Sequence, residues 1–278
     1  PTTVGATFSI SLLSESKMRQ RISDSRVGIA AVSKLTFSNA IAKSKPTLVA
    51  QRWNLTPKNA KTYTQGKGSE PTKPIRFYID DAFPHEWKAA IKQGVELWNK
   101  AFEQAGYLNA IEAVDFPTAD KAFDPDNISF SCIRYVPSAS EKVSSAFMAN
   151  PQTGEIINAT VLVYNDVVNT IDNWRLVQTA QLDPAARAAQ MPDSIVEQTL
   201  EYIIAHEVGH TLGFMHNMAA SAAIPTDSLR SPTFTRKHGT TASIMDYARF
   251  NYVAQPADRG VRLTPPRLGV YDFYAVEW

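Results

Sequence analysis

The sequence predicts an α+β fold of the α/β-sandwich type, in which two long helices cover a sheet. Short runs of β-branched and aromatic residues predict the strands, and Ile75–Ile79 is the clearest of them. Apolar residues between Trp87 and Phe102 recur every three or four positions, which is typical of an amphipathic helix. A similar apolar face over Asp193–Leu212 predicts a second long helix.

The remaining elements can be placed in chain order. We expect strands at Ala6–Leu13, Val27–Phe37, Ile75–Ile79, Ala110–Val114, Ile128–Tyr135, Ser145–Ala149 and Glu155–Tyr164. The first long helix follows Pro84, a residue type that the first turn of a helix tolerates. Pro151–Gly154 predicts a turn, and residues 165–193 predict an irregular or helical insertion.

A polar segment with glycine and proline, residues 65–71, predicts a linker. It separates a β-rich N-terminal segment, residues 1–70, from a main domain, residues 71–278. The N-terminal segment is expected to be part of a preceding domain, a pro-segment or a support for the sheet. The chain begins at Pro1 without a charged and apolar leader, and its last residues continue a helical pattern. We therefore expect a piece of a longer chain, truncated in its C-terminal helix, with additional domains.

The composition excludes several classes of protein. Hydrophobic residues make up 44% of the 278 residues, which argues against disorder and allows a sizeable core. Lys and Arg number 28 and Asp and Glu 27, so a net charge of +1 gives no general attraction to nucleic acid. No apolar run approaches the roughly 18–20 residues that span a bilayer. Cys132 is the only cysteine, which excludes an internal disulfide, and we expect its thiol to be buried in a strand.

Three of the five histidines lie close together, at His206, His210 and His216. In a helix, His206 and His210 lie one turn apart on the same side, about 6 Å along the axis. Two imidazoles in this arrangement can bind one Zn²⁺, which accepts neutral imidazole nitrogens at about 2.0–2.1 Å. Glu207 lies about 100° further round the helix, where it could contact a water molecule at the metal rather than the metal itself.

Gly213 allows the third histidine to reach the same site. A continuing helix would turn His216 away, whereas a glycine can adopt a positive φ, end the helix and bring the chain back. After Glu207 the next glutamate is Glu277, so a glutamate is implausible as the third protein ligand and His216 fits that role. Three protein ligands leave one position open, as in catalytic zinc sites. The alternative is three ordinary histidines on a partly buried helix.

The extended motif over His206–His216 resembles that of the metzincin metallopeptidases. Ser243–Tyr247 is similar to a tight turn of that superfamily, the Met-turn, which holds a methionine beneath the zinc; here it would be Met245. Tyr247 matches a tyrosine that in some metzincins binds the zinc or stabilises the oxyanion, and a packing role is its alternative. The resemblance implies a twisted mixed β-sheet, a long zinc-binding helix and a C-terminal subdomain that carries the Met-turn.

The resemblance also implies a contact surface for a peptide. In metzincins a short edge strand runs antiparallel to the substrate, and Ser145–Ala149 is the matching segment. Ala146, Phe147 and Met148 would contact the substrate there, unless this is a plain edge strand. Ala248–Tyr252 is expected to line the pocket for the residue after the cleaved bond.

The match is closer still to the EcxA-like bacterial zinc peptidases, through His206–Ala219 and Ser243–Asp258, and more weakly through Ser25–Gly28 and Gln51–Trp53. Asn217 follows the third histidine where several metzincin families have Asp, Glu, Ser or Pro. This difference argues against transferring the substrate preferences of those families.

The resemblance implies a zinc-dependent endopeptidase that is exported to the extracellular space, the periplasm or the cell surface. One catalytic Zn²⁺ would be held by His206, His210 and His216, with Glu207 as general base and Tyr247 at the oxyanion. The expected partner is a protein or peptide substrate. The main alternative is a non-catalytic, zinc-stabilised binding or adhesion module, which an intact Glu207 disfavours. A third possibility is a metal-dependent hydrolase of non-peptide amides.

Overall fold

A computed structural model describes residues 3–15, 17–37, 44, 46–188 and 191–278 of the chain. Its centre is a five-stranded sheet with the strand order β4-β3-β5-β7-β6. The strands are β3 (Ile75–Ile79), β4 (Ile111–Asp115), β5 (Ser131–Val136), β6 (Val143–Ala149) and β7 (Ile156–Tyr164). All neighbouring pairs are parallel except β6 and β7, which are antiparallel. The predicted α+β fold with a mixed sheet is therefore confirmed, and β6 lies at one edge.

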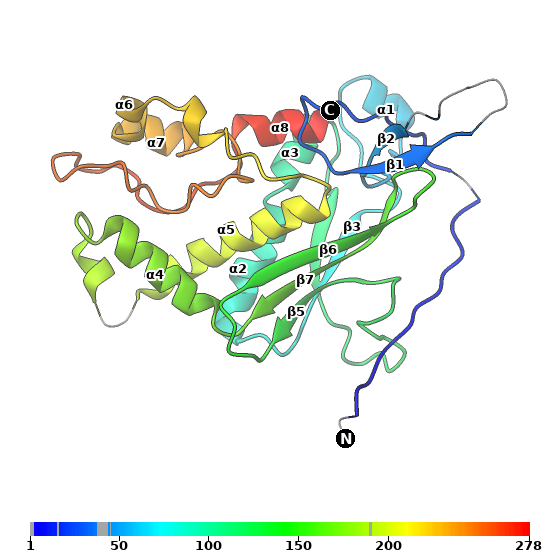
Figure 1. Ribbon diagram of the computed structural model, residues 1–278, viewed down its shortest axis with the longest axis horizontal. Helices are drawn as coiled ribbons and strands as arrows, with labels where there is room; N and C mark the ends of the chain where they lie inside the picture. The colour runs from blue at the N-terminus through cyan, green and yellow to red at the C-terminus, as the bar shows by residue number, and fades with distance from the viewer. Residues whose placement is uncertain (1–2, 16, 38–43, 45, 189–190) are drawn as a thin grey trace.

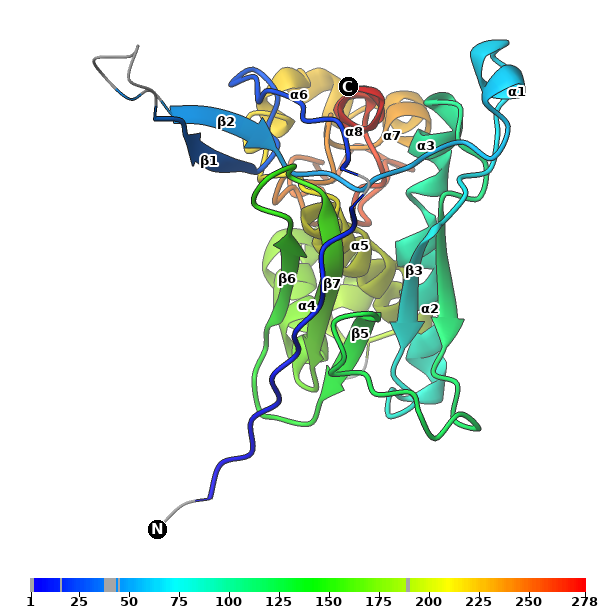
Figure 2. The same ribbon diagram turned by 90° about the vertical axis from the view of Figure 1, so that its right-hand side faces the viewer.

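Two helices, α2 (His85–Glu96) and α5 (Asp193–Thr211), cover one face of the sheet (Figures 1 and 2). The second helix has the predicted position, but the first is shorter than expected, because the chain is interrupted before α3 (Asn99–Gln104). At the interruption, the side chain of Asn99 bonds both the backbone N–H and the carbonyl of Ile111. These bonds tie the start of α3 to the start of β4, while the backbone at Leu97 and Trp98 stays in the helical region.

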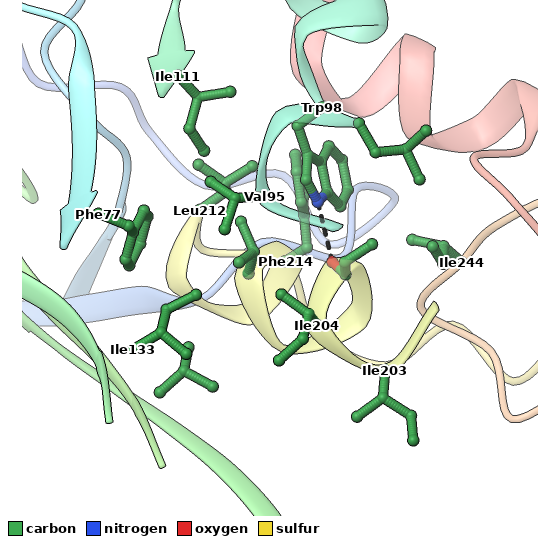
Figure 3. Packing of buried hydrophobic residues seen from close by; sticks show 14 of the residues in the cluster. Phe77, Val95, Trp98, Ile111, Ile133, Ile203, Ile204, Leu212, Phe214 and Ile244 are labelled. Carbon is green, nitrogen blue, oxygen red and sulfur yellow. Dashed lines mark hydrogen bonds between the residues drawn. The ribbon is translucent and has the colours of Figure 1, made fainter. Parts of the chain in front are cut away.

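The hydrophobic core fills the space between this sheet face and the two helices (Figure 3). Phe77 and Ile133 extend from the sheet toward Ile204 of α5, and Trp98 packs beside them. The indole of Trp98 donates a 2.9 Å hydrogen bond to the carbonyl of Ala205, so this large buried side chain has its polar atom satisfied. Cys132 is fully buried in β5, as predicted, and burial raises the pKa of its thiol to about 12.

The N-terminal part of the chain forms an antiparallel pair, β1 (Ala31–Leu35) and β2 (Pro46–Ala50). The strand predicted at Ala6–Leu13 is wrong: these residues have no regular secondary structure. Their alternating pattern gives a strand only if another strand pairs with it. The side chains of Phe8, Ile10 and Leu12 are instead exposed.

Residues near the N-terminus contact the loop that follows α5. The backbone N–H of Ala30 donates to the carbonyl of Gly213, and that of Met215 donates to the carbonyl of Gly28, both at 2.8 Å. The indole N–H of Trp53 donates to the carbonyl of Thr211 at 2.9 Å. These bonds tie the N-terminal segment to the end of α5, while the division of the chain near residue 70 stays a prediction.

Shorter helices complete the described part of the chain. They are α1 (Ala60–Thr64), α4 (Val167–Thr179), α6 (Thr226–Leu229), α7 (Pro232–His238) and α8 (Val270–Glu277), with 3-10 turns at Pro184–Arg187 and Ser221–Ala223. The first half of the predicted insertion is thus helical. Among the described residues, no helix is both long and apolar enough to cross a membrane.

Candidate metal centre

Three imidazoles converge where α5 ends. His206 and His210 lie on the last turns of α5, and His216 lies in the loop that follows. One ring nitrogen from each histidine can be chosen so that all three lie within 4.8 Å of one another. The Nε2 atoms of His210 and His216 are only 3.1 Å apart. The structure therefore brings together the three residues that the motif predicts as ligands.

The loop that positions His216 depends on Gly213, as predicted. Gly213 has a φ of +101°, which glycine adopts without a steric penalty. A Cβ atom there would lie 2.4 Å from the carbonyl oxygen of Gln51. Glycine is therefore needed both for the left-handed turn that ends α5 and for close contact with the N-terminal segment.

Backbone carbonyls orient two of the imidazoles. Nδ1 of His206 lies 2.8 Å from the carbonyl of Ile244, and Nδ1 of His210 lies 2.8 Å from the carbonyl of Phe214. A carbonyl can only accept, so each Nδ1 carries the proton and each Nε2 presents a lone pair. Burial lowers the pKa of His206 to about 4 and also lowers the pKa of His210. Both rings are therefore neutral at pH 7, as ligands must be.

This donor set fits a zinc ion. Tetrahedral coordination with metal–nitrogen bonds of about 2.0 Å places ligand nitrogens about 3.3 Å apart, close to the 3.1 Å separation of the His210 and His216 nitrogens. No second group of histidine, cysteine or acidic residues with metal-binding spacing occurs in the described part of the chain. Three imidazoles leave the fourth position of a tetrahedral ion free.

Glu207 lies beside the three histidines, and Ser145 of β6 contacts it. The hydroxyl of Ser145 donates a 2.6 Å hydrogen bond to Oε2 of Glu207. Burial raises the pKa of Glu207 to about 7, and the bond from Ser145 opposes this shift. A divalent cation at the histidines would add an opposite charge that favours the ionised carboxylate.

The segment Ser243–Tyr247 lies against the histidines. Met245 is buried, and a Cβ atom on Gly209 would lie 2.4 Å from its sulfur, so the glycine within the motif leaves room for the methionine. The ring of Tyr247 lies with its centroid 4.7 Å from that of His216 and 5.6 Å from that of His206. The structure thus places both residues at the centre, although it does not test their predicted roles.

A cavity of about 620 Å³, the central cleft, opens beside this centre. It is lined by Ala30, Val143, Ser145, Ala146, Phe147, Glu207, His210, Phe214, Met215, His216 and Tyr247. One wall is therefore the edge strand β6, whose side chains alternate between the two sheet faces. Met148 points to the face opposite the one that Ser145 and Phe147 share, and its side chain does not line the cleft.

One acidic residue at this site escaped the sequence analysis. Asp272 of α8 is buried, and its Oδ2 accepts 2.7 Å hydrogen bonds from the backbone N–H groups of Ile244 and Gly269. Its Oδ1 accepts a 2.6 Å hydrogen bond from the hydroxyl of Ser243. Asp272 therefore holds the segment whose Ile244 carbonyl orients His206. In the sequence, its only signal is an acid in the first turn of a largely apolar helix.

Comparison with known protein families gave two matches. Residues 188–278, which include all three histidines, match a family model described as Met-zincin. Residues 1–58 match a family model described as Domain of unknown function (DUF5117). No curated protein and no solved structure was found to match the chain. The first match supports a metzincin-type family for the part that carries the site, while the closer resemblance to EcxA-like peptidases stays a prediction.

Proposed function

We propose that this protein is a zinc-dependent endopeptidase that hydrolyses peptide bonds. The observation that carries the proposal is the position of Glu207. Its carboxylate lies beside three neutral imidazoles and faces a cleft with an edge strand along one wall. The Met-zincin match over residues 188–278 agrees with this chemistry.

His206, His210 and His216 would hold the ion. When bound, a zinc ion supplies Lewis acidity, which polarises the substrate carbonyl and lowers the pKa of a bound water to about 7. Glu207 accepts a proton from the attacking water as its oxygen bonds to the carbonyl carbon. Glu207 would then deliver this proton to the amide nitrogen and the carbon–nitrogen bond would break, which gives an amine and a carboxylic acid. The acid would pass its proton to the amine, so the products leave as an ammonium and a carboxylate.

Two further groups would act on the substrate. The hydroxyl of Tyr247 donates a hydrogen bond to the oxygen that gains negative charge. The backbone of β6 would offer its free edge to an extended peptide, because among the described strands β6 pairs with β7 alone. Antiparallel pairing with β6 would place the peptide along the central cleft.

The decisive experiment replaces Glu207. We expect the zinc-loaded wild type to cleave a mixed peptide library, with the products identified by mass spectrometry. Glu207→Ala should retain one zinc ion per chain, measured by elemental analysis, and lose activity by about 10²–10⁴-fold, the contribution typical of a general base. A chelator should abolish the wild-type activity, and added zinc should restore it.

Undiminished turnover in the Glu207→Ala variant would show that another group removes the proton. A wild type that binds one zinc ion but cleaves no peptide would favour a zinc-stabilised binding module instead.

A further inference from the structure

A second cavity opens next to the metal centre, and we name it the α4 cavity. Its volume is about 240 Å³, which suits one side chain rather than a larger ligand. Its lining comes from the start of β6 and the two residues before it, from α4, from α5 and from the loop after Met245. The lining residues are Glu141, Lys142, Val143, Val167, Thr170, Trp174, Tyr202, Ile203, His206, Glu207, Tyr247 and Arg249. His206 and Glu207 belong to both this cavity and the metal centre.

The α4 cavity lies on the side of the metal centre where the residue after a cleaved bond would lie. β6 runs from Val143 to Ala149. Within it, Ser145 lies beside Glu207, because its hydroxyl bonds the carboxylate of that residue. A peptide antiparallel to β6 would run toward Val143 after it passes the metal centre. The α4 cavity is bordered by Lys142 and Val143, so it receives the side chain that follows the scissile bond.

Arg249 supplies the distinctive chemistry of this cavity. Its guanidinium carbon lies 4.0 Å from the ring centroid of Trp174 and 5.5 Å from that of Tyr247. Its φ is +41°, an uncommon backbone conformation for a residue with a side chain. Stacking on an aromatic face leaves the N–H groups at the edge of a guanidinium free to bind a planar acceptor.

Arg249 lacks a partner of opposite charge within the described residues. Its Nε is buried and has no hydrogen-bond acceptor there, and no carboxylate lies within ion-pair distance. Arg134, Arg175 and Arg230, by contrast, each pair with an aspartate. The positive charge of Arg249 is therefore not neutralised by a described residue, so a ligand that brings a carboxylate to the guanidinium is favoured.

Two carboxylates, of Glu141 and Glu207, and a second cation, Lys142, also line the cavity. Glu141 accepts hydrogen bonds from the hydroxyl of Thr170 through its carbonyl and its carboxylate. Glu207 is held by Ser145 at the metal end. Lys142 adds a second positive charge to the lining and, like Arg249, has no ion-pair partner among the described residues.

The α4 cavity contains Arg249 of the segment expected to line the pocket for the residue after the cleaved bond. We propose that Arg249 selects an aspartate or glutamate at this position. This inference rests on the proposed peptidase function and names its substrate class. The carboxylate of the substrate would accept from the edge of the guanidinium, while its methylene groups would pack against Val167 and Trp174.

The test compares peptides that differ only at the residue after the cleaved bond. The four residues are Glu, Gln, Leu and Lys, and the measured quantity is kcat/KM for each peptide with zinc-loaded protein. We expect the wild type to cleave the Glu peptide about tenfold or more faster than the Gln peptide, because a charge-assisted hydrogen bond is lost. Arg249→Gln should bring this ratio close to one, and Arg249→Glu should favour the Lys peptide.

The Glu-to-Gln ratio is measured within one variant, so it does not depend on the fraction of molecules that fold. Arg236→Gln, on the exposed face of α7, is the matched control and should keep the wild-type ratio. A second readout is peptide binding to the Glu207→Ala variant, measured by calorimetry. The Glu peptide should bind more tightly than the Gln peptide, and the added substitution Arg249→Gln should remove the difference.

Cleavage of the Glu and Gln peptides at equal rates would overturn the acidic preference and leave the peptidase proposal intact. An unchanged ratio in Arg249→Gln would also overturn the role of Arg249. Failure to cleave any peptide would overturn the peptidase proposal and this inference with it.

Discussion

Ser145 is the side chain that connects the edge strand to Glu207. Both residues have a part in the proposed chemistry, one at the strand that faces the peptide and the other at the metal. The 2.6 Å bond between them restricts the rotamers of a glutamate that would otherwise be free to turn. Ser145 is thus a positioning residue, since it acts on the substrate through Glu207.

We expect Ser145→Ala to lower kcat about five- to tenfold with little change in KM. The reason is the loss of one hydrogen bond, worth about 1 kcal/mol, that orients Glu207. Ser145→Thr keeps the hydroxyl and should restore most of kcat. Steady-state kinetics on one peptide measures both parameters. Ser144→Ala is the matched control, because Ser144 is exposed on the opposite sheet face. Equal losses in Ser145→Ala and Ser145→Thr would contradict the positioning role.

Asp272 makes the free energy of unfolding depend on pH. Burial raises its pKa to about 6, and the bonds from Ser243, Ile244 and Gly269 oppose this shift. In the unfolded chain an aspartate titrates near about 3.9, so the folded protein binds the proton more tightly. The contribution of Asp272 to stability is therefore complete below about pH 4 and is lost as pH rises to about 6, by at most about 3 kcal/mol.

We expect Asp272→Asn to remove this dependence. Urea unfolding of both proteins between pH 4 and pH 7 gives the difference in their free energies of unfolding. That difference should shift in favour of the variant as pH rises. His206 has the opposite effect, because burial lowers its pKa to about 4, but it is present in both proteins and cancels in the difference. A difference that does not vary with pH would show that the pKa of Asp272 is the same in the folded and the unfolded protein.

The end of α5 shows how an element places a ligand. Helical spacing alone places the side chains of His206 and His210 on the same side of α5. His216 lies next to them only because the chain reverses at Gly213. The reversal is held by backbone bonds from Ala30 and Met215. The third ligand is therefore positioned by two parts of the chain that are far apart in sequence.

We expect Gly213→Ala to weaken zinc binding at least tenfold and to lower the free energy of unfolding by more than about 2 kcal/mol. A left-handed conformation costs alanine about 1–2 kcal/mol, and its Cβ would also clash with the carbonyl of Gln51. Competition with a chromophoric chelator measures zinc affinity, and urea unfolding measures stability.

The matched control is Gly239→Ala. Gly239 has a φ of +75°, but a Cβ atom there meets nothing within 4 Å. This variant should lose only the conformational part of the stability and keep its zinc affinity. If both variants bound zinc like the wild type, the position of His216 would not depend on the turn at Gly213.

Across the whole molecule, local patterns predicted more than long-range contacts. The strand Ile75–Ile79, the helix from Asp193 and the clustering of three histidines follow from spacing within short windows, and the structure has all of them. Polar and apolar residues alternate over Ala6–Leu13 as in a strand, but no described strand pairs with this segment. The strand predicted there from alternation alone is therefore wrong. Strand pairing requires a second segment, so the sequence of one segment does not predict it.

The same limit applies to the candidate site. The ligands and Glu207 lie within eleven consecutive residues, so a motif reveals them. Ser145, Asp272 and Arg249 reach the site from three other elements, and their contacts depend on how β6, α8 and the loop after Met245 fold against α5. No spacing rule relates Asp272 to the motif, so only the three-dimensional structure assigns it. The metzincin resemblance already placed Ser145 in the edge strand and Arg249 in the segment expected to line a pocket, but the contacts of both side chains come from the structure.

The bond from Asp272 to Ile244 has a consequence for biosynthesis. A ribosome translates His206 to His216 well before it adds α8, so the nascent chain carries the complete motif while the carboxylate that anchors Ile244 does not yet exist. Until that helix emerges and docks, nothing from Asp272 fixes the carbonyl that orients His206. We therefore expect a chain that ends before residue 272 to orient the imidazole of His206 less firmly than the full chain does.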